Sequence, residues 1–357
     1  MSDLVVAGAG MAGLVAAARA RELGASVEVY EKGGRVGGSM LLSSGVLWRY
    51  ASFDDFRREC PDGDEDLQRV VHEQLDQGLD WLVGLGAVVT EPSTGNPLTV
   101  GRRFDVRELC GALLRTGPFL QIGQPLEAVP DGVPVVLATG GFQADSWLVR
   151  EWISAEPVLL RSNGCSKGDG LRLGLEAGGV YSAGMDQFYG RAMPAVDHLH
   201  ETHWVRAAQL YARHTVAIEN ASGWRYEGEV DWAELRVVQW IARQSGARAW
   251  FVVPSSALGE PTRYGTVGEQ IERARGLGAA VEQRDQGVAV EVRAAITQTL
   301  GGLRVDTDGR VLRGDGSVVD GLFAAGGDVG GVATGGYMSN LAAALVIGKR
   351  AAEAALR

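Results

Sequence analysis

Residues 4–13 read LVVAGAGMAG, and residues 14–31 continue as LVAAARARELGASVEVYE. The apolar run at residues 4–7 predicts a buried strand, the Ala and Leu spacing after Gly10 predicts a helix, and SVEVYE alternates as a second strand does. Gly8, Gly10 and Gly13 form a Gly-x-Gly-x-x-Gly pattern where the first strand meets the helix. This stretch predicts a βαβ unit of the Rossmann type.

The spacing of these glycines suits a bound dinucleotide. The first allows a tight turn, the second lets a pyrophosphate approach the backbone at the helix N-terminus, and the third lets helix and strand pack closely. Glu31 ends the second strand 18 residues after Gly13, where a carboxylate can accept both ribose hydroxyls. The alternative is a structural glycine turn with a surface glutamate.

A second glycine-rich loop, KGGRVGGS at residues 32–39, follows Glu31 directly. Its amides and the guanidinium of Arg35 suit a second contact with a pyrophosphate and a ribityl chain, which favours FAD over NAD. LFAAGGDVGG at residues 322–331 predicts a third close approach of backbone to ligand. Asp328 in that segment either binds the ribityl hydroxyls or holds a structural turn.

Composition excludes several classes of function. The net charge is −10 with scattered Lys and Arg, so no basic stripe predicts binding to nucleic acid or to a membrane surface. No apolar run approaches the roughly 18 residues of a membrane span, and the N-terminus lacks the pattern of a secretory signal, so we expect a soluble, cytoplasmic protein. Cys60, Cys110 and Cys165 are too far apart for a Cys-x-x-Cys metal or haem motif.

The order of patterns along the chain predicts an α/β fold in which a Rossmann-type FAD-binding domain is interrupted. Residues 1–142 and 296–357 carry the glycine-rich loops and form the two parts of that domain. Residues 143–295 hold most of the tryptophans and form an inserted α+β substrate-cap domain. Long helices are expected at about 65–85 and 340–356, and a hairpin at VLRGDGSVVDG.

Five further sequence segments follow the Gly8–Gly13 motif along the chain. They are GGSMLLSSG at 37–45, VVLATGGF at 135–142, GCSKGDGLRLGLEAGG at 164–179, IENASGWRYEGE at 218–229 and QTLGGLRVDTDGRVL at 298–312. Together they resemble the superfamily of fumarate reductases, succinate dehydrogenase flavoproteins and 3-ketosteroid 1-dehydrogenases. The resemblance implies FAD, a cap domain inserted after the ATGG strand, and hydride exchange between flavin N5 and a carbon beside a carbonyl or carboxylate. Where covalent members carry a flavin-linking histidine this chain has Ser39, Met40 and Leu41, so we expect non-covalent FAD.

Departures from the family pattern concern the substrate. Where dicarboxylate-specific members have a histidine, a proton-donating arginine and a carboxylate-binding arginine, this chain has Gln298, Ala233 or a neighbour with Arg236 one turn on, and Gly335-Gly336-Tyr337. Without these charges we expect a more neutral substrate than fumarate or succinate, and the compact cap segment predicts a small substrate. Tyr337 lies close to, but not at, the position of a ketosteroid-enzyme tyrosine.

Candidates for proton transfer or carbonyl polarisation come from several segments. They are Tyr189, Tyr226, Tyr337, Arg236 and His203. Each tyrosine has the alternative of a packed aromatic residue with a satisfied hydroxyl. His198, His200 and His203 could suggest a metal site, but no carboxylate or cysteine completes a ligand set, so we expect no metal.

The expected cofactor-binding residues come from the glycine-rich loops, the resembling blocks and the start of the final helix, whose amides would face the flavin pyrimidine edge. They are Gly8, Gly10, Met11, Ala12, Gly13, Glu31, Lys32, Arg35, Gly37, Gly38, Ser39, Ser43, Ser44, Gly45, Ala138, Thr139, Gly140, Gly141, Asp169, Gln298, Thr299, Gly327, Asp328, Ser339, Asn340 and Leu341.

The hypothesis from sequence is an FAD enzyme that dehydrogenates a carbon-carbon bond next to a carbonyl of a small substrate, or reduces the enone, and passes electrons to a separate acceptor or oxygen. The alternatives are an alcohol or amine oxidase or dehydrogenase, a non-catalytic flavin-binding protein, and a monooxygenase.

Overall fold

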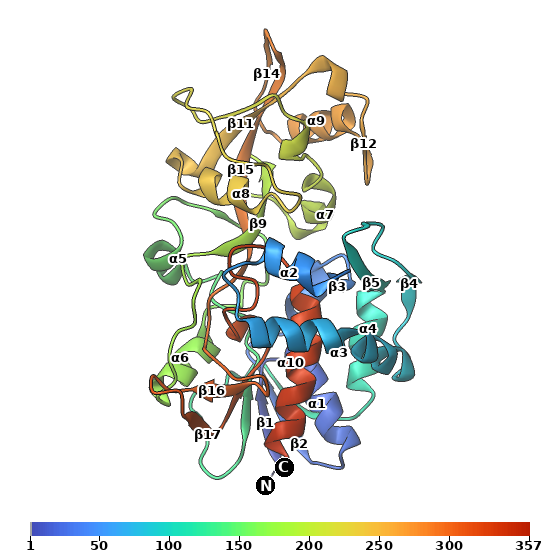
Figure 1. Cartoon of the computed structure of the whole chain (residues 1–357), viewed down its shortest axis with the longest axis vertical. Coiled ribbons are helices and arrows are strands. Elements are labelled where there is room, and N and C mark those ends of the chain that lie inside the picture. The colour runs from blue at the N-terminus through green and yellow to red at the C-terminus, as the bar shows by residue number, and fades with distance from the viewer. Residues whose placement is uncertain (1) are drawn as a thin grey trace. The chain divides into compact units, whose positions relative to one another are not determined.

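The computed structural model describes residues 2–357, and these residues divide into two compact units (Figure 1). Unit 1 contains the described residues up to Asp145, then Ser162–Gln187 and Gln298–Arg357. Unit 2 contains Ser146–Arg161 and Phe188–Thr297. The inserted segment expected at 143–295 therefore encloses a stretch, Ser162–Gln187, that the structure groups with unit 1.

Unit 1 is built on a six-stranded sheet in the order β16-β17-β7-β1-β2-β6. Its strands are β1 (Leu4–Ala7), β2 (Val27–Glu31), β6 (Phe119–Ile122), β7 (Val135–Leu137), β16 (Arg310–Leu312) and β17 (Val318–Ala324). All neighbours are parallel except β16, which pairs antiparallel with β17 at one edge. The residues of β1 and β7 are all buried, as expected for central strands of a parallel sheet covered on both faces.

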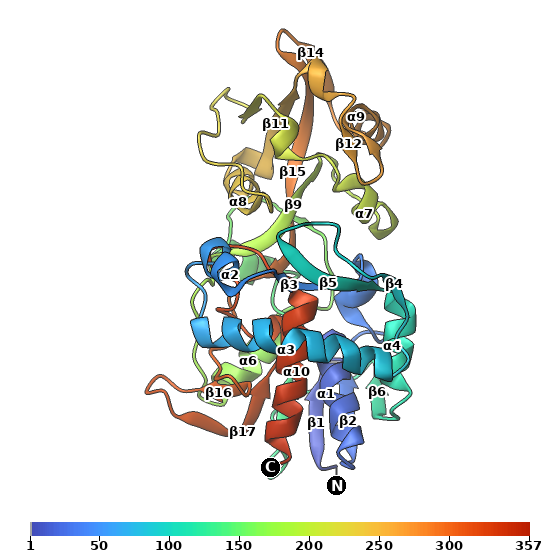
Figure 2. The same cartoon turned by 45° about the vertical axis from the view of Figure 1, so that its right-hand side comes forward.

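Two helices from opposite ends of the chain lie side by side in unit 1 (Figures 1 and 2). They are α1 (Met11–Glu22) and α10 (Asn340–Ala355). Their contact is lined by small residues, and a side chain at Gly348 would come within 2.8 Å of the carbonyl oxygen of Ala12. The close approach therefore depends on glycine and alanine at this crossing. Helix α3 (Glu65–Gly84) also contacts α10.

The rest of unit 1 supports the loops between these elements. A three-stranded antiparallel sheet has the order β3-β5-β4, with β3 (Val46–Tyr50), β4 (Val89–Glu91) and β5 (Thr99–Phe104). The remaining helices are α2 (Phe53–Glu59), α4 (Val106–Leu114), α6 (Asp169–Glu176), and the 3₁₀ turns η1 (Gly38–Leu42) and η6 (Gly326–Asp328). Asp64 and Asp105 cap α3 and α4 by accepting backbone N–H groups of their first turns.

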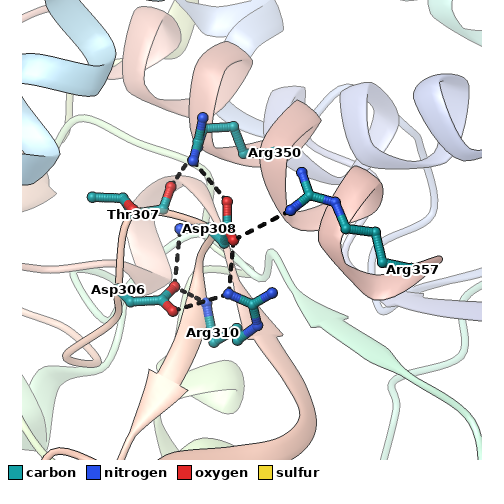
Figure 3. Close-up of polar contacts among 6 residues, drawn as sticks. All are labelled: Asp306, Thr307, Asp308, Arg310, Arg350 and Arg357. Atoms are coloured by element: carbon teal, nitrogen blue, oxygen red, sulfur yellow. Dashed lines mark hydrogen bonds and ion pairs between the residues drawn. The ribbon is translucent and has the colours of Figure 1, made fainter.

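Charged side chains connect α10 to the hairpin at the sheet edge (Figure 3). Asp308 lies 2.7 Å from a guanidinium nitrogen of Arg310, 2.7 Å from one of Arg350, and 3.8 Å from one of Arg357. Asp306 accepts the backbone N–H of Arg310 at 2.9 Å and its guanidinium at 3.2 Å. These contacts hold the C-terminal end of α10 against the turn before β16.

Unit 2 contains a second sheet, in the order β10-β11-β15-β14, with β8 and β9 also paired to β15. The strands are β8 (Leu159–Leu160), β9 (Phe188–Pro194), β10 (Ala217–Glu219), β11 (Arg248–Val253), β14 (Val281–Arg284) and the long β15 (Gly287–Thr299), beside a small β12–β13 hairpin (Pro261–Thr262, Gly265–Thr266). The helices are α5 (Ser146–Trp152), α7 (Trp204–Ala207), α8 (Leu235–Ala242) and α9 (Val267–Gly276), with 3₁₀ turns η2 (Glu201–His203), η3 (Ala212–His214), η4 (Ser245–Ala247) and η5 (Ser255–Ala257).

The α/β fold expected from sequence is confirmed, including the long helices and the C-terminal hairpin. Helix α3 ends one residue before the expected boundary, and α10 ends at Ala355. Within residues 2–357, none of the helices combines the length and the apolar character needed to cross a membrane.

Candidate functional site

The first glycine-rich turn of unit 1 leaves its ligand-facing side open. Gly8 adopts a φ of +102°, and a Cβ there would overlap the backbone of Ala138. A Cβ at Gly13 would overlap the carbonyl of Gly8, whereas a Cβ at Gly10 would meet nothing within 4 Å. No side chain caps the start of α1, so its first amides are available to an anion. This geometry fits the pyrophosphate expected from the sequence.

Glu31 connects the two glycine-rich loops. Its side chain is 6% exposed; Oε2 accepts the N–H of Ala9 at 2.9 Å, and Oε1 accepts the N–H of Gly33 at 2.6 Å. A carboxylate oxygen has more than one lone pair, so these bonds hold the group in place while leaving capacity for hydroxyl donors. The position suits the ribose-binding role expected for it, and the amide partners are an additional finding.

The second loop lies against the first. Gly37 donates its N–H to the carbonyl of Ala9 at 2.7 Å, and a Cβ at Gly38 would lie 3.2 Å from the Cα of Gly10. The hydroxyl of Ser39 lies 3.0 Å from that of Ser162 and accepts the N–H of Asn163. The loop is therefore placed by contacts within unit 1.

Several other expected cofactor residues form hydrogen bonds or ion pairs within unit 1. Ser43 donates its hydroxyl to the carbonyl of Met40 and accepts the N–H of Gly45, so it stabilises its own turn. Lys32 and Asp169 form an ion pair with one another, and Arg35 is exposed. The structure thus brings Lys32 and Asp169, distant in sequence, to one place.

Asp328 is fully buried beneath the loop that follows β7. Its carboxylate accepts the backbone N–H and the hydroxyl of Thr139, and the N–H of Gly141 at 3.2 Å. Burial raises the pKa of Asp328, and these hydrogen bonds act in the opposite direction. These contacts fit the structural-turn alternative, in which Asp328 joins the segment after β17 to the Thr139–Gly141 loop.

An open hollow lies in unit 1 next to the C-terminal glycine run. Its lining residues are all uncharged: Gln298, Thr299, Leu300, Gly326, Val329, Val332, Ala333, Met338, Asn340 and Ala343. Two buried oxygens nearby, Thr299 Oγ1 and Gln143 Oε1, have no hydrogen-bond partner. Both would lie within 3 Å of a Cβ at Gly141, at 2.7 and 2.8 Å. Buried polar atoms of this kind need a partner, which the polar edge of a bound flavin could supply.

A side chain caps the start of α10. Ser339, 3% exposed, accepts the N–H of Ala342 and donates to the carbonyl of Val46 at 3.1 Å. Asn340 lines the hollow and Leu341 is half-buried. Of the three residues expected here to contact the cofactor, Asn340 is therefore the one beside the hollow.

Tyr337 is held by an aromatic cluster on β3. Its carbonyl accepts the hydroxyl of Tyr50 at 2.5 Å and lies 3.7 Å from the thiol of Cys60, while its ring meets that of Trp48 edge-on at 5.4 Å. Burial raises the pKa of the Cys60 thiol to about 12, so this cysteine stays protonated. The GGY segment is consequently anchored through its backbone.

The other expected catalytic residues lie in unit 2, where two of them, Tyr226 and Arg236, share Glu229 as a partner. Tyr226 donates its hydroxyl to the carbonyl of Glu229 and packs on Trp240. Arg236 is exposed and lies 3.7 Å from Glu229, and His203 is exposed at the end of η2. Tyr189 is 7% exposed on β9. Within residues 2–357, no group of three or more His, Cys, Asp or Glu side chains is arranged to hold a metal ion.

Tyr189 belongs to a cluster that the sequence did not predict. The guanidinium of Arg191 lies 5.6 Å from the ring centre of Tyr189 and 5.4 Å from that of Tyr211. Glu234 is buried beside Arg191, at 4.0 Å. The sequence carried no periodic signal for this cluster, because Glu234 precedes α8 and its left-handed backbone takes it off the apolar stripe of the helix.

Comparisons with known proteins agree with this geometry. A family model described as "FAD binding domain" matches residues 3–125 and 132–340. The chain is 43% identical over 79 residues to a fumarate reductase of Schizosaccharomyces pombe, spanning 21% of this chain and only 15% of that protein. It is 23% identical over 427 residues to the fumarate reductase (cytochrome) of Shewanella frigidimarina, covering 92% of this chain and 72% of the relative.

Solved structures share the fold at low identity. The 3-ketosteroid Δ1-dehydrogenase of Sterolibacterium denitrificans has a TM-score of 0.74 at 16% identity, with 99% of each chain covered. An open flavocytochrome c3 fumarate reductase has a TM-score of 0.72 at 19% identity, covering 99% of this chain and 78% of that one. Because the family model covers most of the chain and the glycine-rich loops have the geometry that a dinucleotide needs, the chain belongs to the FAD binding domain family, whose cofactor is FAD.

Proposed function

We propose that this chain is an FAD-dependent oxidoreductase that removes hydrogen from a carbon-carbon bond next to a carbonyl, or adds hydrogen to the enone, in a small substrate that is not a dicarboxylate. FAD bound in unit 1 supplies the hydride acceptor or donor. Support comes from the family membership and from the similarity to fumarate reductases and 3-ketosteroid dehydrogenases, which are named for reactions of this class.

The observation that carries the substrate proposal is the set of residues that replace the family's cations. Gln298 stands where dicarboxylate-specific relatives were expected to have a histidine, Ala233 or a neighbour where they have a proton-donating arginine, and Gly335-Gly336-Tyr337 where they have a carboxylate-binding arginine. Gln298 also belongs to the uncharged lining of the hollow of unit 1. An ionised carboxylate removed from water without a partner is strongly disfavoured. The two ionised carboxylates of a dicarboxylate substrate would therefore lack these cationic partners.

The residues of unit 1 give the cofactor a non-covalent site. The turn at Gly8, Gly10 and Gly13 with the start of α1 would hold the pyrophosphate, and Glu31 the ribose. Met40 is 2% exposed at the position where a flavin-linking histidine was expected, and the Ser39 hydroxyl already bonds within the unit. Acid precipitation should therefore release all of the flavin into the supernatant. Flavin retained in the pellet would contradict non-covalent binding.

The experiment for the reaction is an anaerobic titration of the flavin absorbance with a panel of cyclic enones, their saturated ketones, and fumarate with succinate. We expect saturated ketones to bleach the oxidised flavin, or enones to reoxidise the chemically reduced protein. Reoxidation by fumarate alone would overturn the argument from the replaced cations. An unchanged flavin absorbance with every compound of the panel, together with bleaching by alcohols or amines, would favour the oxidase alternative instead.

The same preparation identifies the electron acceptor. Rapid reoxidation in air would point to oxygen, whereas a reduced flavin that persists in air and is reoxidised by an artificial dye would point to a separate acceptor.

A further inference from the structure

Unit 2 buries one carboxyl in a strained position. Glu234 precedes α8 and is 2% exposed. Its backbone has φ 59° and ψ 23°, the left-handed region, which only one other non-glycine residue of the described chain shares. A left-handed conformation at a residue with a side chain costs free energy and persists where the surroundings impose it, often at functional sites.

The contacts of this carboxyl are incomplete. Oε2 lies 4.0 Å from a guanidinium nitrogen of Arg191, beyond hydrogen-bond distance, and Oε1 has no hydrogen-bond partner. Arg191 donates instead to the carbonyl of Ala233, at 3.4 Å. A buried carboxylate without full hydrogen bonding is costly, so the site favours either a proton on Glu234 or a further polar group brought to it.

Two arginines and two tyrosines surround Glu234. Tyr189 and Arg191 come from β9, which packs on α8, and Tyr211 and Arg213 come from the segment at η3. Arg213 is exposed and lies 4.1 Å from the ring centre of Tyr211, and Arg191 lies 5.4 Å from the same ring. The nearby Asp231 uses its carboxylate to accept the N–H of Leu235.

Protonation of Glu234 changes the charge of this cluster. With Glu234 ionised, its negative charge offsets part of the positive charge of the two guanidinium groups; with Glu234 protonated, that offset is lost. Burial raises the pKa of Glu234 to about 7, while Arg191, Arg213 and the backbone amides of Arg213 and Ala212 act in the opposite direction. The change of charge therefore falls in the neutral range, and the cluster attracts anions more strongly on the acidic side of it.

We propose that the face formed by Arg191, Arg213 and Tyr211 binds one small oxyanion, a carboxylate or enolate oxygen, and that a proton on Glu234 strengthens this binding. This anion site belongs to unit 2, goes beyond the proposed function, and can be tested with no redox chemistry. Glu234 is a positioning residue here, because it acts through the arginines beside it.

The test is calorimetric titration of the whole FAD-loaded chain with acetate and with benzoate from pH 6.0 to pH 8.5, a range in which both ligands are almost entirely ionised. For the wild-type protein we expect the affinity to be about tenfold lower at pH 8.5 than at pH 6.0, since binding is linked to one proton. Glu234→Gln should bind at every pH as the wild type does at pH 6.0. Glu234→Asp, which can still titrate, should keep a pH dependence.

Arginine variants locate the site. Arg191→Gln should lose most of the binding. Arg213→Gln, at an exposed position, should weaken the binding and leave the fold intact, so it provides the test if Arg191→Gln does not fold. Arg243→Gln, exposed at the other end of α8, is the matched control and should bind as the wild type does. Absence of binding by both anions, a pH dependence that survives in Glu234→Gln, or unchanged binding in Arg213→Gln would each overturn the proposal. A chain that binds the anions but fails the redox panel would disprove the proposed function alone.

Discussion

Asp308 in unit 1 and Glu234 in unit 2 are both carboxylates beside arginine side chains, yet their surroundings differ. Asp308 is 16% exposed and has two guanidinium nitrogens at 2.7 Å (Figure 3). Glu234 is 2% exposed, with its nearest guanidinium nitrogen at 4.0 Å and one oxygen without a partner. The number of arginines nearby does not decide the state of a carboxyl. Direct donors and access to water decide it.

Two further carboxylates extend this comparison, because they are buried as Glu234 is but both of their oxygens accept hydrogen bonds. Asp328 accepts from Thr139 and Gly141, and Glu31 accepts from Ala9 and Gly33. If hydrogen bonding of both oxygens distinguishes these groups from Glu234, removing each carboxylate should have effects of different size and sign.

The largest loss is expected for Asp328→Ala, which leaves the Thr139 and Gly141 donors buried without an acceptor. The free energy of unfolding should fall by about 4 kcal/mol, measured by urea denaturation. Asp320→Ala, at an exposed position of β17, is the control and should change it by less than about 0.5 kcal/mol. A loss below about 1 kcal/mol for Asp328→Ala would show that the loop can satisfy its donors otherwise.

The next effect has the opposite sign. The folded-state pKa of Glu234 is raised from 4.5 to about 7, so the folded protein binds this proton more tightly than the unfolded chain. Wild-type stability therefore falls as pH rises from about 4.5 to about 7, by roughly 3 kcal/mol, and stays lower above that. Glu234→Gln should remove this loss and be more stable than the wild type at pH 8, with the difference vanishing near pH 4.5. Denaturation of both proteins across this range checks it, and a variant less stable at pH 8 would refute it.

Glu31→Gln should act on the cofactor more than on the fold. It keeps the shape but loses a charged acceptor for two amides and for the ribose hydroxyls, so the dissociation constant for FAD should rise by about 10- to 100-fold. Flavin fluorescence on dilution measures this constant. Glu28→Gln, on the same strand, is the control. Unchanged FAD affinity would mean that Glu31 serves only to join the loops.

The smallest effect is expected for Asp308→Ala. Its ion pairs are partly exposed, so their loss should cost about 1 kcal/mol or less of unfolding free energy, and the difference from wild type should shrink in high salt. A cost above about 3 kcal/mol, insensitive to salt, would show that this network is as critical as a buried one.

Much of the fold and the geometry of the glycine-rich turns could be predicted from sequence, because both depend on local patterns. Gly8, Gly10 and Gly13 are needed where backbone approaches backbone or ligand, and Glu31 ends the strand that follows them. These constraints act over a few residues, so a single chain displays them. The β16–β17 hairpin and the two long helices were predicted for the same reason.

The partners of the functional groups were decided only by tertiary structure. Asp328 joins a loop 187 to 189 residues away, and Lys32 meets Asp169. The place of Glu234 between Arg191 and Arg213 depends on how β9, η3 and α8 pack, which no spacing in the sequence encodes. The sequence alone therefore determined an FAD-type Rossmann fold, because hydrogen bonding and glycine geometry are local. Which carboxyls are ionised, satisfied or strained was decided by the folded chain, because desolvation and charge act between residues distant in sequence.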